Sequence, residues 1–258
     1  MTIDVLIVSA AMAVAAGLIG CFAVIRRMAL AGDAMAHIAL PGIGVALALH
    51  VHPVFGAAAM LFFGALLVWA VDDCSRVATE TLIGVLFSTA LAIGSMMTSG
   101  EDLIGALLGS PADLSRPELV FGLAASAAVI TFVLLRRNEM ILALLSPDVA
   151  RTAGVNVSLL NLAYLQMFAL TVALGLRYLG VLLMGSLIII PAASAKRVSG
   201  SLNQMLTIAA LTSVAATLIG ATIAGRLHRE AGPLIITVAA AGFLLTFAWP
   251  VRRLALWS

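Results

Sequence analysis

The chain has 258 residues, of which 63% are apolar and only 10% are charged, and its mean hydropathy is +1.17. A soluble domain of this length needs far more polar surface, so the composition excludes a soluble enzyme and indicates an integral membrane protein. The net charge of +2 is too small to predict a nucleic-acid partner. The two cysteines, Cys21 and Cys74, are too few for a disulfide framework or a thiolate cluster, so we expect both to be free.

Nine apolar runs follow one another along the chain. Their length, close to 20 residues, suits helices that cross a membrane, and they lack the strict alternation of barrel strands. The first run has no basic region before it, so we expect a retained span and not a cleaved signal peptide. The runs lie at about 3–25, 30–49, 53–71, 80–98, 117–135, 157–176, 178–195, 204–224 and 233–250.

The segment 102–118 is the exception in this pattern, because its apolar part is too short to cross a membrane. A re-entrant half-helix or a helix on the outer surface suits it better. The sequence therefore predicts one all-α domain over residues 1–258 with eight or nine spans.

The basic residues are distributed unevenly between alternate breaks in these runs. Because cytoplasmic loops carry an excess of Lys and Arg, the richer set predicts the cytoplasmic side, with the C-terminus inside and, for nine spans, the N-terminus outside. Ten of the fourteen basic residues belong to that set, namely Arg26, Arg27, Arg76, Arg136, Arg137, Arg151, Lys196, Arg197, Arg252 and Arg253.

Asp33 and His37 are polar residues within the second apolar run. Side chains four apart lie on one face of a helix, so these two can reach one metal ion. Ionisable residues inside a membrane are costly, which makes the pair a candidate functional site. The structural alternative is that Asp33 caps the helix and His37 bonds a nearby carbonyl group.

The longest predicted cytoplasmic break, residues 136–158, contains a short helix signal. Ser146 is a suitable N-cap, Pro147 suits the first helical position, Asp148 favours the helix N-terminus, and Gly154 is placed to end the helix. We expect a short surface helix that a peripheral partner could contact, with a plain connector as the alternative.

The sequence resembles the permease subunits of bacterial ATP-binding-cassette importers for zinc and manganese. Order and spacing agree over nearly the whole chain. Four stretches carry the resemblance, with a weaker fifth: RRMALAGDAMAHIALPG at 26–42, ETLIGV at 80–85, SPDVARTAGV at 146–155, GSLIIIPAASAKR at 185–197 and AGP at 231–233.

The resemblance implies a helical permease of the bacterial cytoplasmic (inner) membrane that works as a pair. Two copies of a separate ATPase would bind below it, and a soluble extracytoplasmic metal-binding protein would deliver the ion. Asp33 and His37 match the family's acid and histidine in the metal pathway. The family's ATPase-docking segment matches about 140–156, with Ser146, Pro147, Asp148, Ala150 and Gly154 as contact residues.

Four further residues are weaker metal candidates. Glu80 matches a position that is often acidic in the family, but its place at a helix end suits a solvated cap equally well. His50, His52 and His228 fall in outer breaks, where an exposed loop histidine is more common than a ligand.

The chain carries no phosphate-binding loop, so we expect it not to be an enzyme and any ATP hydrolysis to occur on a partner. A proton-coupled secondary transporter of a divalent cation is the alternative, but inverted halves with paired broken helices are not evident. A membrane metalloprotease would need His-Glu-xx-His, which is absent around His37. No covalently bound cofactor is expected. The ligand types suit zinc first and manganese second as the transported ion.

Overall fold

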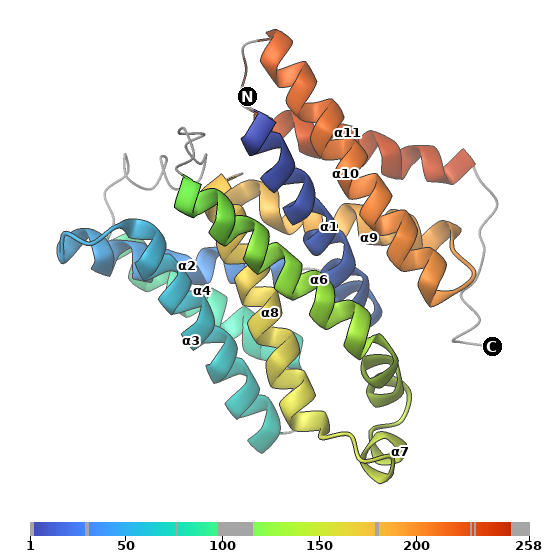
Figure 1. The fold of residues 1–258 in the computed structure, drawn as a ribbon. Coiled ribbons are helices and arrows are strands. Elements are labelled where there is room, and N and C mark those ends of the chain that lie inside the picture. The colour runs from blue at the N-terminus through green and yellow to red at the C-terminus, as the bar shows by residue number, and fades with distance from the viewer. Residues whose placement is uncertain are drawn as a thin grey trace.

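The computed structural model describes residues 3–28, 31–75, 77–97, 116–178, 181–227, 229 and 231–248. All regular structure in these residues is helical, as the sequence predicts (Figure 1). The helices are α1 (Ile3–Ile25), α2 (Ala31–Ala48), α3 (Pro53–Cys74), α4 (Thr79–Met97), α6 (Arg116–Leu145), α7 (Pro147–Thr152), α8 (Val157–Tyr178), α9 (Val181–Val198), α10 (Leu202–Leu227), α11 (Ala231–Leu245) and the short 3-10 helix η1 (Thr246–Ala248).

Among the described residues, eight helical segments are long and apolar enough to cross a membrane. They are α1, α2, α3, α4, α6, α8, α10 and α11 continued by η1. The remaining run, at 178–195, forms α9, which is not among the eight and ends with Lys196 and Arg197. The prediction of an all-helical membrane protein with eight or nine spans is confirmed. The segment expected at 102–118 lies outside the described residues, except that 116–118 begin α6.

Helix α1 forms the centre of the bundle. It packs against α6, α8, α9 and α10, and Figure 1 shows it running between α6 and α10. Small residues permit this close approach. A Cβ atom on Gly17 would lie 2.6 Å from Ser213 Oγ of α10, and one on Gly20 would collide with the carbonyl oxygen of Ile188 of α9. Glycine is therefore required on two sides of α1.

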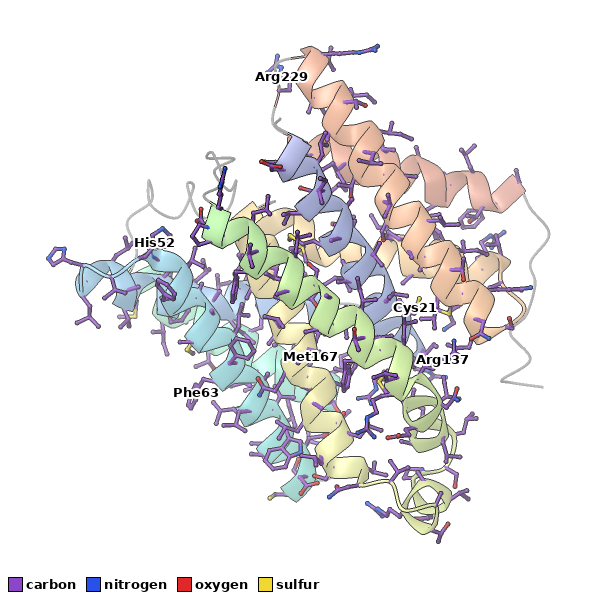
Figure 2. The ribbon with its side chains drawn as sticks, viewed as in Figure 1. Cys21, His52, Phe63, Arg137, Met167 and Arg229 are labelled. Atoms are coloured by element: carbon purple, nitrogen blue, oxygen red, sulfur yellow. The ribbon has the colours of Figure 1, made fainter. Side chains whose placement is uncertain are left out.

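The loops predicted to be cytoplasmic gather at one end of the bundle. Residues 26–28, 72–80 and 143–161 contribute to the lining of one pocket. Arg137 of α6 donates a hydrogen bond to Asn203 at the start of α10 at 2.9 Å, so the break before α10 lies at the same end. In Figure 2, Arg229 lies at the opposite end from Arg137. Successive loops thus lie at alternate ends of the bundle, as the positive-inside rule requires. Which end faces the cytoplasm stays a prediction.

Both cysteines are free, as expected. Cys21 is buried inside the bundle, with its sulfur 3.7 Å from the carbonyl oxygen of Met205, and Cys74 is exposed at the end of α3.

Candidate functional site

Helix α2 begins after a tight turn at the end of α1. Arg27 has φ of 61°, in the left-handed region, and the Met28 N–H donates to the Ala23 carbonyl at 2.8 Å. The Ala31 N–H then donates to the Met28 carbonyl at 3.0 Å. This turn satisfies carbonyl groups at the end of α1 and directs the chain back into the bundle as α2.

Asp33 and His37 lie one turn apart on α2, as the sequence predicts. The helix continues past them through Pro41 to Ala48, so the i and i+4 side chains share a face. Asp33 is exposed on the single chain and His37 is half-buried. The Nδ1 atom of His37 is buried and has no hydrogen-bond partner among the described residues.

Helix α9 packs closely on α2 beside Asp33. A Cβ atom on Gly185 would lie 2.9 Å from the backbone nitrogen of Asp33, and one on Gly32 would lie 3.2 Å from the Cα of Gly185. The glycine at 185 therefore lets the two backbones meet. This contact with α9 fixes the position of Asp33 along the axis of the bundle.

This arrangement offers a metal ion an oxygen ligand and a nitrogen ligand. No group of three or more His, Cys, Asp and Glu side chains close enough to hold an ion occurs in the part of the chain that the structure describes. Among the described residues, Asp33 and His37 would by themselves not complete the coordination shell of a metal ion.

Glu80 is not placed with this pair. It is the second residue of α4 and is exposed in a pocket at the end that carries the α1–α2 and α3–α4 turns. The ring of His37 lies against Phe87 of α4, which is seven positions after Glu80 or about 10 Å along the helix. Of the two alternatives for Glu80, the solvated position at a helix end therefore fits better than a place beside Asp33 and His37.

His50 and His52 form no metal-binding group with the pair among the described residues. His52 caps α3, because its Nδ1 accepts a hydrogen bond from the Val54 N–H at 3.4 Å. His50 adopts a left-handed φ of 55° in the turn before it. His228 lies outside the described residues.

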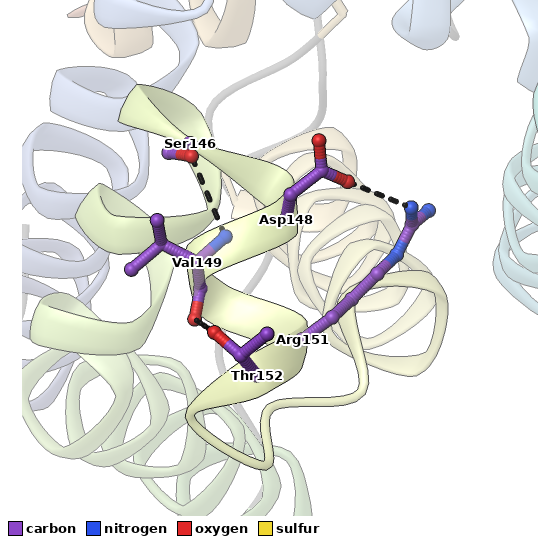
Figure 3. A network of polar contacts seen from close by, with 5 residues as sticks. All are labelled: Ser146, Asp148, Val149, Arg151 and Thr152. Atoms are coloured by element: carbon purple, nitrogen blue, oxygen red, sulfur yellow. Dashed lines mark hydrogen bonds and ion pairs between the residues drawn. The ribbon is translucent and has the colours of Figure 1, made fainter.

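The expected surface helix is present as α7. Ser146 is its N-cap, with its hydroxyl accepting from the Val149 N–H at 3.4 Å, and Pro147 is its first residue (Figure 3). Ala150 is fully buried and anchors the helix. Gly154 follows with φ of 83°, the left-handed conformation that glycine adopts without strain.

The outer surface of α7 is available to a partner. Asp148 and Arg151 form an ion pair of 3.4 Å in which both side chains are exposed, so the pair adds little stability. Val149 is 53% exposed, and Leu145 beside it is 55% exposed. In Figure 1, α7 projects beyond the ends of α6 and α8.

A polar network near α7 was not anticipated from the sequence. The Arg26 guanidinium lies over the ring of Tyr164, 4.3 Å from its centre, and its Nη1 donates to Oδ1 of Asn161. The Asn161 amide donates to Asp72 at 3.1 Å, and the Thr79 hydroxyl donates to the same carboxylate at 2.7 Å. Burial lowers the pKa of Arg26, while Tyr164 and Asp72 oppose this shift.

Arg26, Asp72, Thr79 and Asn161 border a pocket of about 670 Å³ at the predicted cytoplasmic end. Acidic and basic side chains both face it, including Asp73, Glu80 and Arg151. A polar Asn161 within the apolar run 157–176 was the sequence signal that could have revealed the network.

Comparison with known proteins gives similar sequences over almost the whole chain. A "Probable iron transport system membrane protein" of Haemophilus influenzae is 30% identical, over 92% of this chain and 89% of its own length. A "Manganese transport system membrane protein MntC" of Halalkalibacterium halodurans is 29% identical, over 92% and 83%. A "High-affinity zinc uptake system membrane protein ZnuB" of Buchnera aphidicola is 25% identical, over 85% and 86%.

The fold is shared with a solved structure, "PsaBC from Streptococcus pneumoniae in complex with Fab". The TM-score is 0.81 at 24% identity, over 96% of this chain and 91% of the other. The model of the ABC 3 transport family matches residues 1–249. With eight helices in the described part of the chain long and apolar enough to cross a membrane, the protein is a multi-pass protein of the bacterial inner membrane. The chain belongs to the ABC 3 transport family.

Proposed function

We propose that this chain is the membrane permease of an ATP-driven importer that moves a divalent transition-metal ion into the cytoplasm. The observation that carries the proposal is the pair on α2, an exposed Asp33 carboxylate and a His37 whose buried Nδ1 has no partner among the described residues. Relatives named for iron, manganese and zinc support the choice of cargo.

The position of the pair supports a transport role. Arg26 and Arg27 mark the predicted cytoplasmic boundary, and α2 begins at Ala31, so His37 lies about 9 Å along α2 and inside a predicted membrane span. Asp33 lies in the first turn of the same span, where a carboxylate inside a membrane segment is costly unless it has a partner. A divalent cation is such a partner.

A second copy of the chain would complete the site. Because Asp33 is exposed on the single chain, it is free to face a two-fold axis. Two chains then supply two carboxylates and two imidazoles, which suffices for four-coordination. A shell assembled from two chains opens when the chains move apart, so the ion can be released.

The energy would come from a separate ATPase that binds α7. Val149 of α7 and Leu145, the last residue of α6, are both exposed, and the Ser146 N-cap stabilises α7 at the predicted cytoplasmic end. An extracytoplasmic metal-binding protein would deliver the ion at the opposite end. A proton-coupled transporter without an ATPase receives no support from the family match.

The names of the more similar relatives modify the expected order of metals. Affinity trends along the first-row series place zinc above manganese and iron. The relatives named for iron and manganese are 30% and 29% identical, whereas the zinc relative is 25% identical. We therefore propose manganese or ferrous iron ahead of zinc.

Transport by the complete complex tests the proposal. The chain is reconstituted with its ATPase in liposomes, and uptake of manganese, ferrous iron and zinc is measured with ATP, without ATP, and with a proton gradient alone. We expect uptake only with ATP. Equal uptake driven by a proton gradient in the absence of the ATPase would contradict the importer and favour the secondary transporter.

A further inference from the structure

The first turns of α8 are fastened to the end of α1. Asn161 lies four residues after the start of α8, and its Oδ1 accepts a hydrogen bond from Nη1 of Arg26, the first residue after α1. The guanidinium also stacks over Tyr164 one turn further along the same helix, 4.3 Å from the ring centre. Arg26 is therefore held to α8 by two separate contacts.

The same part of α8 is hydrogen-bonded to α3 and, through Asp72 of α3, is linked to α4. The Asn161 amide donates to Asp72 near the end of α3, and Asp72 also accepts from Thr79, the first residue of α4. Ser158 accepts from the Trp69 indole at 3.1 Å and donates to Asp73 at 2.8 Å. The end of α1 and α3 thus contact the beginning of α8 directly, and α4 is linked to it through Asp72.

A short, internally bonded connection joins α8 to the docking helix α7. The Val155 N–H donates to the Ala150 carbonyl at 3.0 Å, which folds the connection back onto α7. Asn156 caps α8, because its side chain accepts from the Leu159 N–H at 3.0 Å. With its backbone bonded at both ends, the connection transmits a displacement of α7 to the start of α8.

On the other side, Arg26 is only seven residues before Asp33. The turn between α1 and α2 is tight, with Met28 bonded back to Ala23 and Ala31 bonded to Met28. Two backbone hydrogen bonds therefore link the end of α1 to the start of α2, two residues before Asp33.

We propose that Arg26, Asn161 and Asp72 form a clasp that couples α7 to the position of Asp33 and His37. The inference rests on the proposed function and names three positioning residues within it. The amide of Asn161 suits this place because it accepts from a cation and donates to an anion at the same time. Loss of the amide leaves both charges without their shared partner and removes one of the two contacts that hold Arg26 to α8.

Asn161→Leu tests the clasp, with Asn203→Leu as its matched control. Asn203 also accepts a hydrogen bond from an arginine, Arg137, at the same end of the molecule, but this pair joins α6 to α10 and does not involve α7 or α8. Both variants are assembled with the ATPase in liposomes. Manganese uptake, ATP hydrolysis and manganese binding without nucleotide are measured for each.

We expect Asn161→Leu to lower the number of ions moved per ATP by at least about fivefold, the lower range of allosteric coupling factors. Manganese affinity without nucleotide should stay at the parent value, which separates lost coupling from general damage. Asn203→Leu should keep the parent ratio of ions to ATP. Arg26→Lys, which retains the charge, should keep part of that ratio.

The experiment distinguishes failure of the proposed function from failure of the clasp. If the parent complex moves no metal with ATP, the proposed function fails. If the parent moves metal and Asn161→Leu keeps its ratio of ions to ATP, the clasp is wrong and the proposed function stands. Should Asn161→Leu not assemble, the isosteric Asn161→Asp, which places a carboxylate against Asp72, gives the same comparison.

Discussion

The imidazole ring of His37 on α2 lies 5.4 Å from the ring of Phe87 on α4, with the two planes inclined at 59°. This contact joins a proposed metal ligand to a helix that contributes no ligand of its own to the site. Tilted aromatic pairs at this distance are favourable, so Phe87 restricts the orientation of the imidazole. A ligand held in one orientation binds an ion with less loss of side-chain freedom.

Phe87→Ala should therefore weaken metal binding by about two- to tenfold, the worth of one aromatic pair. Isothermal titration of the assembled complex with manganese measures the effect. Phe63→Ala is the control, because Phe63 is 52% exposed on α3 and lies on the outside of the bundle in Figure 2. Unchanged affinity in Phe87→Ala would show that the ring does not orient His37.

The orientation in the membrane is predicted by the ten basic residues of the richer set of breaks. In a background with Cys21→Ser and Cys74→Ser, a thiol reagent that does not cross membranes should label Ser201→Cys only from the cytoplasmic side. It should label Arg229→Cys only from outside. Both positions are exposed and lie at opposite ends of α10. The reverse labelling would overturn the topology and the place of α7.

Gly154→Val should uncouple the ATPase from transport while the protein remains in the membrane. Valine at φ of 83° is strained by at least about 1 to 2 kcal/mol, so the end of α7 must change its path. A Cβ at this position meets no other atom within 4 Å, so packing is not disturbed.

Gly242→Val is the matched control for Gly154→Val. It also has open space around the added Cβ, but its φ lies outside the left-handed region. Uptake and ATP hydrolysis at the parent rate in Gly154→Val would refute the docking assignment of α7.

The helices were predictable because each membrane span needs a run of apolar residues of sufficient length. Helix α7 was predictable for a different reason, since capping depends on residues close in sequence, and Ser146, Pro147 and Gly154 occupy the expected positions. Asp33 and His37 were found because a polar pair in an apolar run is conspicuous at helical spacing.

Contacts between distant segments were not predictable. The sequence identifies Arg26 only as a positive charge at the membrane boundary. The structure packs it against Tyr164 and Asn161 of α8. Ser199 falls in a short polar break and would be expected at the surface, yet it is fully buried. Both outcomes depend on which helices become neighbours, which a hydropathy pattern does not specify.

The number of metal ions bound to the assembled complex tests the central claim most directly. It is measured by mass spectrometry after equilibration with manganese in the absence of nucleotide. We predict one ion per pair of chains in the parent and in the control His52→Ala, whose histidine caps α3 and lies away from the site. Asp33→Ala and His37→Ala should each bind none while still assembling with the ATPase. A full complement of manganese in either variant would contradict the assignment of Asp33 and His37 as the shared metal site.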